Sequence, residues 1–181
     1  RGFDVYITGG QLRVLATTVD SKNKENIEVV GIKAKAGYTA GYSDPDYVRG
    51  LPTFQLPFLS EDKKYRTFQI EGDSMQPIPH GSYVIAEFVE NWKEMRDGHA
   101  YIVLTLDEGI VFKVAFNQLR TKKKLLLKSL NKEYKDYEVE VNQVKEIWKF
   151  IYYFTNELPE PLSSMEELSG MVKQLHDKLI L

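Results

Sequence analysis

The chain has 181 residues, of which 28% are charged, 43% are hydrophobic and none is cysteine, and its formal net charge is −2. This length suits one domain of ordinary size with appendages, and the lack of cysteine excludes a disulfide-stapled secreted module, a zinc finger and a thiol nucleophile. No apolar run approaches the roughly 20 residues of a membrane span, so we expect a cytoplasmic protein without a membrane anchor, and the charge gives no overall attraction to nucleic acid.

The first thirty residues predict a linker with a β-hairpin. Two apolar-alternating runs, Asp4 to Thr8 and Gln11 to Val19, flank Gly9-Gly10, which is typical of a tight hairpin turn. The polar stretch from Asp20 to Glu28 is expected to be a loop. Because the chain begins at Arg1, we expect a further region upstream of it.

Residues 31–60 have a different composition. Small residues, glycine, proline and tyrosine dominate between Ile32 and Pro57, which predicts an extended, turn-rich segment laid across a surface.

Residues 61–155 predict a mostly β core. Short runs rich in Val, Ile, Tyr and Phe recur here, and Asp107-Glu108-Gly109 between two of them is typical of a hairpin turn. Such spacing favours an antiparallel or mixed sheet that curls or packs in two layers. The predicted strands are Arg66–Glu71, Tyr83–Val89, Ala100–Leu106, Ile110–Phe116, Lys124–Leu130, Glu138–Val141 and Val144–Phe154.

Residues 156–181 predict an amphipathic C-terminal helix. Pro159 and Pro161 precede a capping serine, and apolar residues then recur at a spacing of three and four at Met165, Leu168, Val172, Leu175 and Leu179. The helix either docks on its own domain or pairs across a dimer, and the sequence leaves both open.

Most motifs of enzyme chemistry are missing. His80, His99 and His176 show no metal-ligand spacing, so no metal and no cofactor is expected. No phosphate loop, dinucleotide fingerprint or GxSxG elbow occurs. The basic run from Arg120 to Lys124 is interpreted as a solvated hairpin tip.

A serine and a lysine remain as candidates. Ser74 lies in Gly72-Asp-Ser-Met-Gln-Pro77, a turn at a strand end, and Lys113 lies in an apolar strand. A serine hydroxyl needs a base to become a nucleophile, and burial lowers the pKa of a lysine so that its amine can serve as that base.

Five ordered blocks between residues 29 and 154 resemble the LexA, phage CI repressor and UmuD family of self-cleaving Ser-Lys proteins, which is peptidase S24-like. They are Phe68-Gln-Ile-Glu-Gly-Asp-Ser-Met-Gln-Pro77, Gly81-Ser-Tyr-Val-Ile-Ala86, Arg96-Asp-Gly-His-Ala-Tyr-Ile-Val103, Val111-Phe-Lys113 and Ser129-Leu-Asn-Lys-Glu-Tyr134. The resemblance implies a LexA-like, β-clip-like fold, a curled and partly open barrel-type sheet. Two positions depart from the family pattern: Val114 stands where a second basic residue is frequent, and Gly31 where proline is common.

The resemblance also implies a cleavable Ala-Gly bond upstream of the serine. Ala36-Gly37 is the favoured bond and Ala40-Gly41 is the alternative. Tyr38 and the run from Ile32 to Ala36 are expected to hold this segment as a strand added to the sheet. Ser74 would attack the Ala36 carbonyl and Lys113 would carry the proton. The backbone N–H groups of Ser74 and Asp73 would hold the oxyanion.

In such a repressor this domain forms a homodimer, an upstream helix-turn-helix binds operator DNA, and a RecA-type filament acts as co-protease in the SOS response. Cleavage then relieves repression. Two alternatives stay open: a non-catalytic dimerisation and partner-binding module of the same fold, and a UmuD-like polymerase accessory protein.

Overall fold

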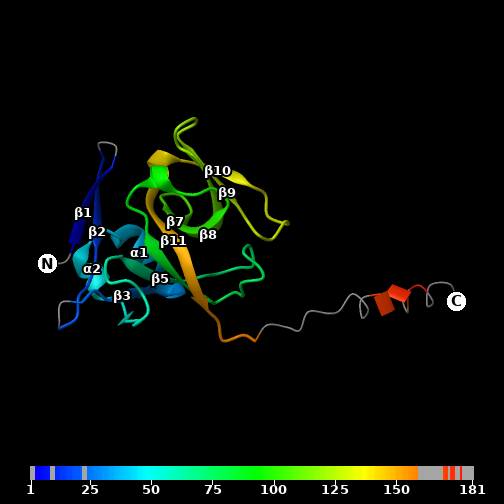
Figure 1. Ribbon diagram of the computed structural model, residues 1–181, viewed down its shortest axis with the longest axis horizontal. Helices are drawn as coiled ribbons and strands as arrows, with labels where there is room; N and C mark the ends of the chain where they lie inside the picture. Colours follow the sequence, from blue (N-terminus) through cyan, green and yellow to red (C-terminus); the bar gives the residue numbers. More distant parts are fainter. Residues whose placement is uncertain are drawn as a thin grey trace.

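The N-terminal hairpin predicted from the sequence is present. The computed structural model describes residues 3–8, 11–21, 24–158, 169–170, 172–173 and 176. Strands β1 (Phe3–Thr8) and β2 (Gln11–Ala16) pair antiparallel, with Thr8 opposite Gln11. In Figure 1 this two-stranded ribbon stands at one side of the molecule.

One open mixed sheet of nine strands forms the core of the molecule, in the order β10-β9-β8-β7-β11-β6-β5-β3-β4. All neighbours are antiparallel except β3 and β5, which run parallel. The mostly β, curled, LexA-like fold predicted from the sequence is therefore confirmed. The strands are β3 (Ile27–Val30), β4 (Thr53–Phe54), β5 (Tyr65–Gln69), β6 (Tyr83–Phe88), β7 (His99–Thr105), β8 (Gly109–Gln118), β9 (Lys124–Lys128), β10 (Tyr137–Glu140) and β11 (Val144–Phe154).

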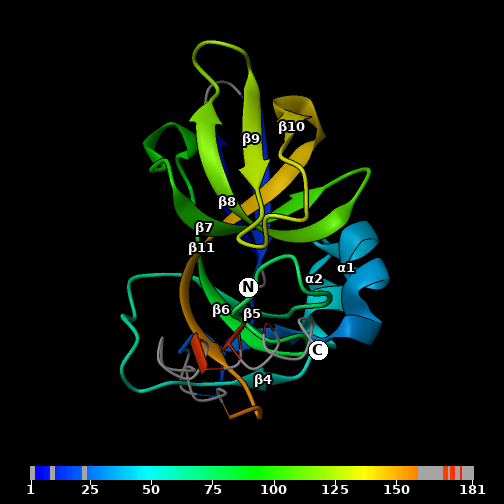
Figure 2. The ribbon, with the colours of Figure 1, turned by 90° about the vertical axis from the view of Figure 1, so that its right-hand side faces the viewer.

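Strand β11 connects two halves of the sheet. Its first part pairs with β7 and its second with β6, and register shifts occur in both pairings. Such irregularities bend a strand and increase its twist. Figure 2 shows β11 running between a half formed by β7–β10 and a half formed by β5 and β6. Two clusters of buried side chains form the core. One lies in the β7–β10 half around Leu125 and Ile147, and the other, around Phe68 and Trp148, spans both halves because it includes residues of β7 and β8.

The prediction of an extended segment between residues 32 and 57 is wrong for residues 32–49. Residues 32–49 form the 3-10 helix η1 (Ile32–Ala34) and the short helices α1 (Lys35–Gly41) and α2 (Pro45–Arg49). Asp44 caps α2 by accepting from the backbone N–H of Asp46 at 2.9 Å, and α1 buries Tyr38 completely. Capping and burial thus override a glycine-rich composition that disfavours helix.

The loop predicted for residues 20–28 is shorter than expected, because β3 begins at Ile27. Two short 3-10 helices, η2 (Trp92–Glu94) and η3 (Val141–Gln143), were not predicted from the sequence. At the β8–β9 turn, Lys122 and Lys124 pair with Glu138 at 3.2 and 3.1 Å, which fits a solvated tip.

The C-terminal prediction lies mostly outside the described residues. Residues 156–158 are not helical, whereas 169–170, 172–173 and 176 are. Within the described part of the chain, no helix is long and apolar enough to span a membrane.

Candidate functional site

Ser74 lies in a compact turn between β5 and β6. Gly72 has φ of 83°, a left-handed conformation that favours glycine, and its N–H donates to His80 Nδ1 at 3.0 Å. The N–H of Gln76 returns to the Asp73 carbonyl at 3.2 Å, and Met75 is buried in the core. The turn therefore holds Ser74 in a fixed, half-buried position at the end of a strand.

Lys113 lies in the middle of β8, opposite Tyr101 of β7, and only 9% of its surface is exposed. Its ammonium group donates to Ser129 Oγ at 3.0 Å and lies 5.5 Å from the centre of the Tyr134 ring. Burial lowers the pKa of Lys113, and the negative charge of Glu108 opposes that shift. The amine consequently loses its proton more readily than that of an exposed lysine.

The loop after β9 contacts both candidates. Ser129 accepts from Lys113, while the backbone N–H of Asn131 donates to the Ser74 carbonyl at 3.1 Å. Tyr134 donates to the Asp73 carboxylate. The loop thus fixes the Ser74 turn relative to β8. Ser129 and Tyr134 were not candidates from the sequence, although both belong to the last of the five blocks.

Ser74 and Lys113 line one pocket of about 160 Å³. The lining also includes Lys35, which forms an ion pair with Glu71 at 3.7 Å. A larger pocket, of about 530 Å³, lies between β3, β5 and the segment 55–63 and contains neither candidate. The smaller pocket is lined by Lys35, Gln69, Ile70, Glu71, Gly72, Ser74, Met75, Ile102, Ile110, Val111, Phe112 and Lys113.

The two candidates share this pocket without a direct hydrogen bond. Among the described residues, the Ser74 hydroxyl has no hydrogen-bond partner, and the hydrogen bond of Lys113 goes to Ser129. The backbone N–H groups of Asp73 and Ser74 likewise donate to no described acceptor. The pocket therefore offers the hydroxyl and N–H group of Ser74 and the buried amine of Lys113, whereas Asp73 is not among its lining residues. A hydroxyl, a base and N–H donors are the components of acyl transfer by a serine.

Both candidate bonds lie outside the pocket. Ala36-Gly37 and Ala40-Gly41 are within α1, so the added strand predicted for Ile32 to Ala36 is wrong. Ala36 and Gly37 are exposed, and the next residue, Tyr38, is fully buried. A Cβ on Gly37 would come within 2.7 Å of the Tyr47 hydroxyl, and that hydroxyl donates to the Ala34 carbonyl at 3.0 Å. Close packing against Tyr47 therefore stabilises the helical conformation.

The described residues hold no group of three or more His, Asp or Glu side chains that could bind a metal ion. His80 accepts from Gly72, and His99 Nδ1 lies 3.0 Å from the Asp97 carbonyl.

A curled, bulged β-sheet with a strand-end serine and a buried lysine in one pocket defines a LexA-like domain. Comparison with protein families agrees, since the Peptidase S24-like family matches residues 28–151. The chain belongs to this family. No curated protein matches the chain.

We predict that Lys113 titrates below the ordinary lysine value of about 10.4, because it is buried. Replacing Glu108 by Gln removes the charge that supports the ammonium form, so Glu108→Gln lowers the pKa further. NMR titration of the lysine side chains measures both shifts. Glu138→Gln is the matched control, because Glu138 pairs with Lys122 and Lys124 instead. A Lys113 pKa at or above that of the exposed lysines would contradict this description of the pocket.

Proposed function

We propose that the chain is the C-terminal dimerisation and self-cleaving domain of a LexA/CI-like transcriptional repressor, a cytoplasmic protein that cuts itself at Ala36-Gly37. The observation that carries this proposal is the pocket, which brings together Ser74, the buried Lys113 and Lys35, the residue directly before Ala36. The family supports a peptidase-type domain.

The proposed reaction is cleavage of the Ala36-Gly37 bond by Ser74 and Lys113. Ser74 Oγ attacks the Ala36 carbonyl carbon while Lys113 Nζ, in its neutral form, takes the hydroxyl proton. The N–H groups of Ser74 and Asp73 stabilise the oxyanion. Lys113 then returns the proton to the leaving nitrogen of Gly37, and water hydrolyses the ester at Ser74. Ser129 is a positioning residue that holds Lys113.

Cleavage requires α1 to unwind, because its bonds lie outside the pocket. The helix has only seven residues, and two of them are glycines, which lower helix stability by about 1 kcal/mol each relative to alanine. Unwinding from Lys35, which already lines the pocket, brings Ala36-Gly37 to Ser74 first. Ala40-Gly41 lies about a helical turn further along, so we favour Ala36-Gly37.

Intact mass measured after incubation from neutral to alkaline pH tests this proposal. We predict fragments ending at Ala36 and beginning at Gly37, formed faster as pH rises because the active base is the deprotonated amine, and levelling off above the pKa of Lys113. Ser74→Ala and Lys113→Ala abolish the cut. Ser129→Ala slows it about tenfold, a part of the 10²–10⁴-fold that a positioned base contributes.

The same cut in Ser74→Ala protein would refute the assignment. No cut at any pH, with or without a RecA-type filament, would favour the alternative, a non-catalytic dimerisation module of the same fold. A UmuD-like polymerase accessory protein would cleave but would lack the upstream helix-turn-helix that we propose binds operator DNA.

We propose that a second copy of the chain covers the aromatic patch formed by Phe58, Tyr83, Tyr152 and Phe154. These side chains are 62, 38, 47 and 44% exposed. Phe154 pairs with Tyr83 across β11 and β6, and Phe58 packs edge-on against Tyr152. Exposed aromatic side chains of this kind are enriched in protein interfaces.

For this interface we predict that Phe154→Glu shifts sedimentation from dimer to monomer. Leu106→Glu, at an exposed position in the β7–β8 turn, is the control and leaves the dimer intact. If both variants sediment as dimers, the aromatic patch is not the dimer contact.

A further inference from the structure

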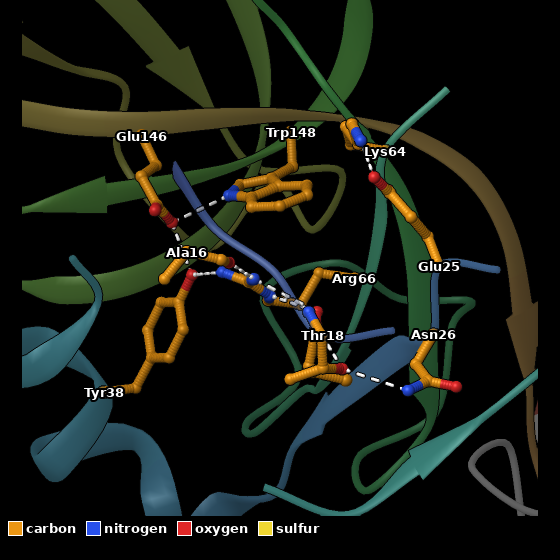
Figure 3. Close-up of polar contacts among 10 residues, drawn as sticks. Ala16, Thr18, Glu25, Asn26, Tyr38, Lys64, Arg66, Glu146 and Trp148 are labelled. Atoms are coloured by element: carbon orange, nitrogen blue, oxygen red, sulfur yellow. Dashed lines mark hydrogen bonds and ion pairs between the residues drawn. The ribbon is translucent and has the colours of Figure 1, made fainter. Parts of the chain in front are cut away.

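A buried polar cluster joins β3, α1, β5, β11 and the end of the N-terminal hairpin, which are far apart in the sequence (Figure 3). At its centre is Arg66 of β5, which is completely buried. We call the group the Arg66 cluster; it consists of Ala16, Thr18, Glu28, Tyr38, Arg66, Glu146 and Trp148. A guanidinium with no access to water is costly unless all its partners are in place, so the conformations of these segments are linked.

On one side, the cluster holds the segment that carries the candidate bond. Arg66 Nη1 donates to the Tyr38 hydroxyl at 2.6 Å, and that hydroxyl donates to Glu146 Oε2 at 2.5 Å. The Tyr38 ring packs edge-on against Phe68, with ring centres 5.8 Å apart. Tyr38 follows Gly37 directly, so moving Ala36-Gly37 into the pocket requires Tyr38 to leave Arg66 and Glu146.

On the other side, the cluster holds the end of the N-terminal hairpin and the chain after it. Arg66 Nη2 donates to the Ala16 carbonyl at 2.5 Å. The backbone N–H and the hydroxyl of Thr18 each donate to Glu28 Oε1 at 2.8 Å, while Glu28 Oε2 accepts from Arg66 at 3.1 Å. Leu15 is fully buried in the same core cluster as Tyr38.

If α1 or the end of the hairpin leaves the cluster, buried polar groups that remain in the cluster lose hydrogen-bond partners. Without Tyr38, Glu146 keeps only Trp148 Nε1 as a donor, at 2.9 Å, and its second oxygen already has no partner among the described residues. Without Ala16 and Thr18, Arg66 and Glu28 lose partners and their burial. A buried polar group left unpaired is strongly unfavourable, so each docked segment stabilises the docking of the other.

We propose that the Arg66 cluster couples docking of the β1–β2 hairpin to docking of α1, so that releasing the hairpin releases the self-cleavage segment. The coupling is reciprocal, as any coupling between two equilibria must be. Its consequence for cleavage rests on the proposed function, in which the hairpin connects to an upstream DNA-binding domain. The state of that domain then regulates exposure of Ala36-Gly37.

Amide hydrogen exchange tests the coupling without any cleavage when the full chain carries Ser74→Ala. Two conservative substitutions perturb the cluster from opposite sides. Tyr38→Phe removes the hydroxyl in α1 but keeps the ring, and Thr18→Val removes the hydroxyl after the hairpin. Tyr42→Phe is the matched control, because the Tyr42 hydroxyl has no hydrogen bond among the described residues.

We expect both Tyr38→Phe and Thr18→Val to accelerate exchange about tenfold in both β1–β2 and α1, within the usual range of coupling between sites. Exchange in β8 and β9 and in the Tyr42→Phe protein stays as in the parent. Acceleration confined to the segment that carries the substitution, no acceleration in either segment, or an equal rise in β8 and β9 would each overturn the proposal. None of these outcomes depends on whether Ser74 cleaves the chain.

Discussion

The buried guanidinium of Arg66 constrains the arrangement of the whole candidate site. It lies on β5, 4.8 Å from the centre of the Trp148 ring, and its hydrogen bonds reach β3, α1 and the end of the N-terminal hairpin. Burial raises the pKa of the neighbouring Glu146, while the charge of Arg66 opposes that shift. A charge in this position is stable only while its partners stay in place, so the cluster selects one conformation of the segments around it.

That conformation separates the candidate nucleophile from its candidate substrate. Ser74 and Lys113 are positioned by the turn after β5, by β8 and by the loop after β9. Helix α1 contributes Lys35 to the same pocket, where it forms an ion pair with Glu71. The Ala36-Gly37 bond is held in a helix by Tyr38 and Tyr47. Under the proposed function, Ser74 and Lys113 already lie in one pocket, and delivery of the bond to them is the regulated step, which keeps an intramolecular reaction from occurring as soon as the protein folds.

Runs rich in Val, Ile, Tyr and Phe, separated by turns with glycine and polar residues, predicted β5 to β11 well. Buried and less buried residues alternate in β9, whereas β6 and β7 are buried along most of their length. The Ser74 and Lys113 candidates followed from a turn motif and from a lysine in an apolar strand. The helices at 32–49 were missed because they depend on burial of Tyr38 and capping by Asp44, which local composition does not reveal. Arg66 was missed for a similar reason: its partners Glu28 and Glu146 are 38 and 80 positions away, and only the folded sheet brings them together.

The most direct test of this account is the rate of self-cleavage of Tyr38→Phe protein with Ser74 intact, measured by intact mass beside the parent protein at the same alkaline pH. We expect the same two fragments, formed about tenfold faster, because the substitution releases the segment without altering Ser74 or Lys113. A rate equal to or below that of the parent, with the fold preserved, would contradict the claim that release of Tyr38 limits cleavage.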